Sequence, residues 1–83
     1  MRGELDTAVA TFSEAAGRWA SYGHPWEEAH ARFGAGRCLF ALGRPTEALV
    51  SLREARDLFG RLGAGPVIAE VDERLSRATA RTS

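Results

Sequence analysis

The residues able to act as metal ligands or nucleophiles are few and widely spaced in this chain. His24 and His30 are the only two histidines, and their spacing of six residues puts them on different faces of a helix. Cys38 is the single cysteine and lies eight residues after His30, on roughly the same helical face. A structural metal site usually takes four ligands, so this pair would need further ligands from elsewhere. The pattern predicts no metal site and no cofactor.

The other candidate catalytic groups have simpler explanations. Glu27 and Glu28 follow a proline at a predicted helix start, where the helix dipole favours negative charge. An acid–base pair would instead need burial to raise the pKa of one carboxyl group. Cys38 lies among apolar neighbours, which is typical of a buried and inert thiol. No histidine–carboxylate arrangement accompanies the serines Ser13, Ser21, Ser51 and Ser76. We therefore predict no catalytic residues and no enzymatic activity.

Composition and charge narrow the classes of partner. The chain has 83 residues, enough for one domain, and its 11 basic residues balance 11 acidic ones. A net charge of zero argues against the phosphates of nucleic acids and against anionic membranes, so we expect neither partner. Trp19 and Trp26 could stack on bases, but the neutral charge favours packing of these rings between helices. The lone cysteine and the absence of a leader or a long apolar run predict a cytoplasmic protein.

Apolar residues recur at spacings of three and four along most of the chain, which predicts an all-α fold. The expected helices lie at about residues 4–22, 25–42, 45–62 and 66–78, and a disordered tail is expected at 79–83. Gly23, Gly43 and Gly63 end the first three helices as C-terminal caps, so consecutive helices should form antiparallel hairpins. Gly34 and Gly36 interrupt the second helix and indicate a close approach of neighbouring backbones.

The chain resembles itself when Gly3 is placed on Gly43. This 40-residue shift also places Ala8 on Ala48, Phe12 on Leu52, Ala15 on Ala55, Trp19 on Phe59 and Gly23 on Gly63. A register of turn glycines and apolar positions at such a period is typical of a solenoid of helix pairs. We therefore predict a single repeat domain at residues 1–78, with about two repeat equivalents.

The repeated hairpin resembles the tetratricopeptide repeat. That family has a small residue midway along its first helix, a glycine at the turn, and then alanine, a bulky apolar residue and alanine in its second helix. Those places are held here by Gly36, Gly43, Ala48, Leu52 and Ala55. Longer repeats ending like residues 61–64 are similar to the C-terminal helical arrays of bacterial LuxR-type signalling ATPases and related regulators. The resemblance implies a fragment of an α-solenoid built from stacked antiparallel hairpins.

The resemblance also implies a function, because the usual role of this family is to bind peptides on the concave surface formed by the first helix of each pair. The positions that would face this surface in the second predicted helix are His30, Phe33, Arg37 and Phe40. The 40-residue shift carries the first three of them to Glu70, Glu73 and Arg77. Arg37 and Arg77 would hold a carboxylate, and Phe33 and Phe40 would hold an apolar anchor. The alternative is that these residues form a solvated surface or pack against a neighbouring repeat.

The point in the repeat at which the chain is expected to start leaves outer helices without a neighbour, and two explanations for this are open. The chain is expected to start with the second helix of one pair and to end with the first helix of another, so each outer helix lacks a neighbour. Either this is part of a longer array, or the exposed ends, with Phe12 and Trp19, pair in a symmetric homodimer. We therefore expect a protein–protein interaction or scaffold module within a larger bacterial regulatory protein. The alternative is a self-associating structural element that forms a homo-oligomer and has no separate ligand.

Overall fold

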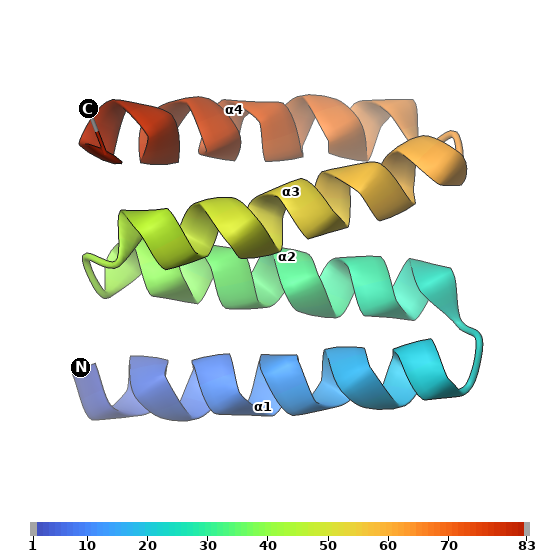
Figure 1. Cartoon of the computed structure of the whole chain (residues 1–83), viewed down its shortest axis with the longest axis horizontal. Coiled ribbons are helices and arrows are strands. Elements are labelled where there is room, and N and C mark those ends of the chain that lie inside the picture. The colour runs from blue at the N-terminus through green and yellow to red at the C-terminus, as the bar shows by residue number, and fades with distance from the viewer. Residues whose placement is uncertain (1, 83) are drawn as a thin grey trace.

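The computed structural model describes residues 2–82, and within them the chain forms four α-helices and no strand. The helices are α1 (Arg2–Ser21), α2 (Pro25–Ala41), α3 (Pro45–Arg61) and α4 (Gly65–Thr82). Consecutive helices run antiparallel and lie in a row in chain order, with α1 and α4 at its two edges (Figure 1). The all-α fold of four antiparallel helices that the periodicity predicts is confirmed.

The row of helices is thin and has its core in the middle. The molecule measures 31 × 25 × 16 Å, and one helix with its side chains is about 10–12 Å across. Each helix packs against the next, and α2 also touches α4 across α3. The buried apolar side chains come mainly from α2 and α3, with Val71 and Ala78 added by α4. The two inner helices therefore position the outer ones.

The three turns between the helices share one hydrogen-bonded motif and are evenly spaced along the chain. Gly23, Gly43 and Gly63 have φ angles of 72°, 76° and 68°, in the left-handed region that glycine adopts without steric cost. At the first turn, the Gly23 N–H donates to Ala20 O at 3.1 Å and the His24 N–H donates to Trp19 O at 2.9 Å. The other two turns repeat this pair of bonds in the same register around their own glycines. Each is a Schellman C-cap, as the glycine positions predict.

The glycines in α2 allow this helix to approach both of its neighbours, α1 and α3, closely. A Cβ atom built on Gly34 would lie 2.6 Å from the ring of Phe12 on α1, and one on Gly36 would lie 2.7 Å from the side chain of Leu52 on α3. Contacts this short do not occur between real carbon atoms, whose favourable separation is about 3.5–4.0 Å. The close approach expected at these two positions is confirmed.

The end of α4 differs from the expected disordered tail. The helix continues through residues 79–82, while Ser83 lies outside the described residues. Alanine and arginine favour helix in this segment, and the Arg81 guanidinium lies 5.1 Å from the centre of the Phe40 ring on α2. The Thr82 hydroxyl also donates to the carbonyl oxygen of Thr79 at 2.9 Å. This cation–π contact with α2 was not visible in the local composition from which the tail was predicted.

Candidate functional site

The four residues of α2 that are predicted to face a bound peptide lie in different environments. Phe33 is only 5 % exposed and belongs to the core, and the Arg37 guanidinium covers its ring at 4.9 Å from the ring centre. Phe40 is half-buried and lies under Arg81. His30 is exposed, and its ring packs edge-on against Trp26 and Phe59. In this structure Phe33 is therefore a core residue, and the role of Phe33 and Phe40 in holding an apolar anchor of a ligand stays a prediction.

The predicted residues on α4 form a polar surface. Glu70, Glu73 and Arg77 are all exposed. An Arg77 guanidinium nitrogen lies 2.7 Å from a carboxylate oxygen of Glu73, one helical turn earlier. Arg77 thus already has an acidic partner on its own helix, which lowers its net attraction for an external carboxylate. The paired role of Arg37 and Arg77 stays a prediction.

A largely apolar groove lies between α1 and α2. It has a volume of about 400 Å³ and is lined by Phe12, Ala15, Trp19, Trp26, Glu27, His30 and Ala31. Trp19 is 36 % exposed and Trp26 is 44 % exposed. The chain has no other tryptophan, so both of its indole rings lie at this groove. Of the predicted site residues, only His30 takes part in it.

Aromatic contacts hold the walls of this groove in place. The Trp26 ring centre lies 4.7 Å from that of His30 and 5.5 Å from that of Phe59, and the His30 and Phe59 centres are 5.0 Å apart. On the opposite wall, the Trp19 ring packs edge-on against Tyr22 and His24. Edge-on aromatic pairs of this kind contribute about 0.5–1.5 kcal/mol beyond the area that they bury. The groove is therefore positioned by α3 and by the α1–α2 turn.

Glu27 is the only carboxylate among the residues that line this groove. One of its carboxylate oxygens lies 3.8 Å from Nδ1 of His24, which carries a charge only when it is protonated. The groove therefore combines a largely apolar lining with one negative charge near the turn. A ligand with an apolar face and a basic group at its edge matches this arrangement.

Two further grooves are more polar. A small one of about 180 Å³ between α2 and α3 is lined by Glu28, Arg32, Glu54, Asp57, Leu58 and Arg61. Within it, Arg32 lies 2.7 Å from Glu28 and 3.6 Å from Glu54, so these three charges already pair with one another. This internal pairing makes the small groove a weaker candidate for an external ligand than the aromatic groove.

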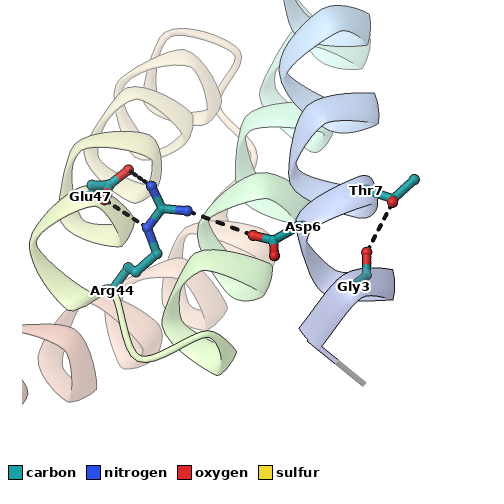
Figure 2. Close-up of polar contacts among 5 residues, drawn as sticks. All are labelled: Gly3, Asp6, Thr7, Arg44 and Glu47. Carbon is teal, nitrogen blue, oxygen red and sulfur yellow. Dashed lines mark hydrogen bonds and ion pairs between the residues drawn. The ribbon is translucent and has the colours of Figure 1, made fainter.

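The third groove, of about 350 Å³, is lined by Val9, Ser13, Leu39, Arg44, Glu47, Val50 and Ser51. Arg44 is one of these lining residues, and Figure 2 shows its guanidinium between the carboxylates of Glu47 and Asp6. The distances are 2.8 Å to Glu47 and 3.9 Å to Asp6. The Asp6 pair joins the α2–α3 turn to α1, and the Glu47 pair joins it to the start of α3. Near the start of α1, the Thr7 hydroxyl donates to the carbonyl oxygen of Gly3 at 2.9 Å (Figure 2).

Reactive groups are not clustered in the part of the chain that the structure describes. No three histidine, cysteine, aspartate or glutamate side chains within residues 2–82 gather closely enough to hold a metal ion. Cys38 is a free thiol and is half-buried. None of the described helices is both long and apolar enough to span a lipid bilayer.

Sequence reasoning placed Phe12 and Trp19 at an exposed end in one of its two explanations, but it missed the groove because it favoured packing between helices for both tryptophans. The signal was present in the 40-residue shift, which places Trp19 on Phe59 and Trp26 on Pro66. Phe59 is fully buried, whereas Trp19, its counterpart, is partly open. The difference arises because α1 lies at the edge of the row and has a helix on only one side (Figure 1).

Comparisons of the chain with models of known protein families, with curated proteins and with solved structures gave no match.

Proposed function

We propose that this chain is a protein–protein interaction module whose binding surface is the aromatic groove between α1 and α2. The supporting observation is that Trp19 and Trp26 both lie in the lining of an open groove of about 400 Å³. Tryptophan is among the residues most enriched at interface hot spots. A partner that covers both indole rings would bury a large apolar area within a small footprint.

We further propose that the chain consists of tetratricopeptide-like helical repeats. The support is the recurrence of the same turn at even spacing, so that two consecutive helices make up one period of the 40-residue shift. The match of apolar positions at that period is the second support. Stacked helix pairs form extended binding surfaces in repeat proteins. By the resemblance to bacterial regulators, the module would act within a larger cytoplasmic regulatory protein.

The direct test is selection of ligands followed by groove variants. Peptides of about 15–20 residues are selected from a display library on the immobilised protein, and their affinities are measured by fluorescence anisotropy. Trp19→Ala and Trp26→Ala should each weaken binding by about tenfold or more, as expected for hot-spot residues. Val50→Ala is the matched control, since Val50 is 57 % exposed on α3 and lies outside the groove. Circular dichroism confirms that each variant is folded.

The results of these measurements decide whether the ligand binds the aromatic groove or the polar surface of α2 and α4. Binding that survives both tryptophan variants but is lost in Arg37→Glu would assign the ligand to the polar surface of α2 and α4 and would contradict the groove. Binding that is weakened by neither tryptophan variant nor by Arg37→Glu would contradict an interaction role for either surface.

The same groove also supports self-association as a second candidate function. An open apolar surface with two indole rings can be covered by another copy of the chain. Sedimentation equilibrium would then show a mass that rises with concentration to that of a dimer, and Trp26→Ala would return the protein to a monomer. A monomer at all concentrations would exclude this function.

A further inference from the structure

We infer that the α1–α2 groove is an unfilled helix-binding position of the same kind as the one that α2 fills against α3 and α4. Its ligand is an amphipathic helix with the small, aromatic and basic residues of α2. The inference rests on the proposed function and adds the class and orientation of the ligand.

The first step is a comparison of equivalent residues on α1 and α3. The 40-residue shift places Phe12, Ala15 and Trp19 of α1 on Leu52, Ala55 and Phe59 of α3. On α3 these three residues are 1 %, 0 % and 0 % exposed, whereas all three α1 residues are partly open and line the groove. The same face is therefore covered on α3 and open on α1.

The second step identifies what covers the face of α3. Gly36 of α2 lies directly over Leu52, and the rings of Trp26 and His30 pack on Phe59. Since α2 packs on α3 and also touches α4, it lies against the surface that α3 and α4 form together. The small residues of α2, Ala29 and Gly36, let its backbone come close to α3.

The third step compares the α2 residues that line the groove with their counterparts on α4, which lie one 40-residue period later in the sequence. The 40-residue shift carries Trp26, Glu27, His30 and Ala31 of α2 to Pro66, Val67, Glu70 and Val71 of α4, of which Val71 is buried in the core and Val67 packs against it. These four α2 residues are the ones that line the groove opposite α1. The groove is therefore the counterpart of the position that α2 fills, and within residues 2–82 no helix occupies it.

Charge gives the ligand its orientation. In the filled position, Arg32 of α2 lies 3.6 Å from Glu54 of α3. The shift places Glu54 on Glu14 of α1, which is exposed and forms its ion pair with Arg18 on its own helix, at 2.7 Å. A helix seated as α2 is seated would bring its arginine to Glu14 and its aromatic N-terminal end to Trp19. The ligand should thus run antiparallel to α1, as α2 does to α3 (Figure 1).

The surface formed by residues 2–82 offers one open helix-binding position of this kind. On α4, the residues equivalent to the face that α2 turns toward α3 are Ala69, Glu73, Ser76 and Ala80, and all of them are exposed. This face carries two polar residues, two alanines and no large apolar side chain, and capping helices of repeat arrays likewise present an outer face that needs no neighbour. Binding should therefore occur with a stoichiometry of one peptide per chain.

The probe is a synthetic peptide of residues 24–42, with blocked ends, Cys38 replaced by serine and a fluorescein label. Its anisotropy is titrated with the intact 83-residue protein. Ala15→Arg should fill the groove and weaken binding by about tenfold or more. Ala10→Arg is the matched control, because Ala10 is exposed on α1 and does not line the groove. Both variants should keep the circular dichroism spectrum of the unchanged protein.

A charge exchange tests the orientation. The peptide with Arg32→Glu should bind the unchanged protein less tightly, and the protein variant Glu14→Arg should restore its affinity. Saturable binding with these responses supports the inference. Failure of the peptide to bind, while library ligands still depend on Trp19 and Trp26, would overturn it and leave the proposed function standing. Failure of every peptide to depend on the two indoles would contradict both.

Discussion

Leu52 of α3 occupies the space that a side chain on Gly36 of α2 would need. A Cβ atom on Gly36 would lie 2.7 Å from both Cγ and Cδ2 of Leu52 and 3.4 Å from its backbone nitrogen. Leu52 is fully buried and cannot turn toward solvent to make room. The pair sets the distance between the two inner helices.

Gly36→Ala should destabilise the fold even though alanine favours helix. Overpacking a buried contact costs about 1–3 kcal/mol and opposes the roughly 1 kcal/mol that alanine gains over glycine in a helix. We expect a lower midpoint of urea unfolding. Gly17→Ala is the matched control, since nothing lies within 4 Å of its Cβ position in α1, and it should raise stability by about 0.5–1 kcal/mol. Equal effects of the two changes would contradict the close approach.

Gly43→Ala should destabilise the α2–α3 hairpin through the backbone. Gly43 has a φ angle of 76°, and an L-residue with a Cβ pays about 1–2 kcal/mol in this region. Gly43→Asn should recover part of the loss because asparagine tolerates the left-handed conformation. Thermal unfolding followed by circular dichroism measures both. Equal melting temperatures for the two variants would mean that the turn does not need this conformation.

Ala48→Glu should unfold the domain. Ala48 is completely buried in the core, and a carboxylate placed there would have no partner to offset its loss of hydration. Val50→Glu on the same helix is the control, because Val50 is largely exposed. We expect the helical signal at room temperature to be lost in the first variant and kept in the second. A cooperative melt of the Ala48 variant near that of the unchanged protein would contradict this placement.

The helices and turns could be predicted because local chemistry determines them. A glycine at each turn accounts for the left-handed C-cap, and spacings of three and four account for the apolar faces. The end of α4 could not be predicted in this way. Its order includes a contact between Arg81 and Phe40, which are far apart in the sequence and lie on helices that are not consecutive.

The candidate site was harder to predict than the fold because it depends on which faces of the helices are left without a neighbouring helix. Phe33 and Trp26 are both large aromatic residues on α2, and the sequence does not separate them. The structure buries Phe33 and leaves Trp26 partly open, since α3 and α4 cover one side of α2 while the groove beside α1 stays uncovered. Burial of this kind follows from the arrangement of the helices and not from local periodicity.

The two tryptophans should report their positions by fluorescence quenching. Trp19 is 36 % exposed and Trp26 is 44 % exposed, so acrylamide should quench both in the folded protein, though less than in the urea-unfolded chain. Trp19→Phe and Trp26→Phe each leave a single emitter, and the remaining Trp26 should be quenched slightly more than the remaining Trp19. A pair of indoles shielded from acrylamide would show that the groove is closed in solution.

The ion pair between Arg56 of α3 and Asp72 of α4 should make the attachment of α4 sensitive to salt but not to moderate pH. The Arg56 Nε donates to Asp72 at 2.5 Å, and this hydrogen bond and the adjacent negative charge raise the pKa of Arg56 above its ordinary value. A raised pKa means that the contribution is fully present below the ordinary arginine value and is lost only at more alkaline pH. Titration of Arg56 therefore leaves stability unchanged between about pH 6 and pH 9.

Arg56→Gln should lower the melting temperature slightly, because both partners are exposed to solvent and the pair is weak. The difference in melting temperature between this variant and the unchanged protein should become smaller as the salt concentration rises from about 0.05 M to 0.5 M, since counterions screen the attraction between Arg56 and Asp72. Arg53→Gln is the control, as Arg53 is exposed on the same helix and does not take part in this ion pair. A difference that persists at high salt would show that Arg56 stabilises α4 through packing of its aliphatic stem and not through its charge.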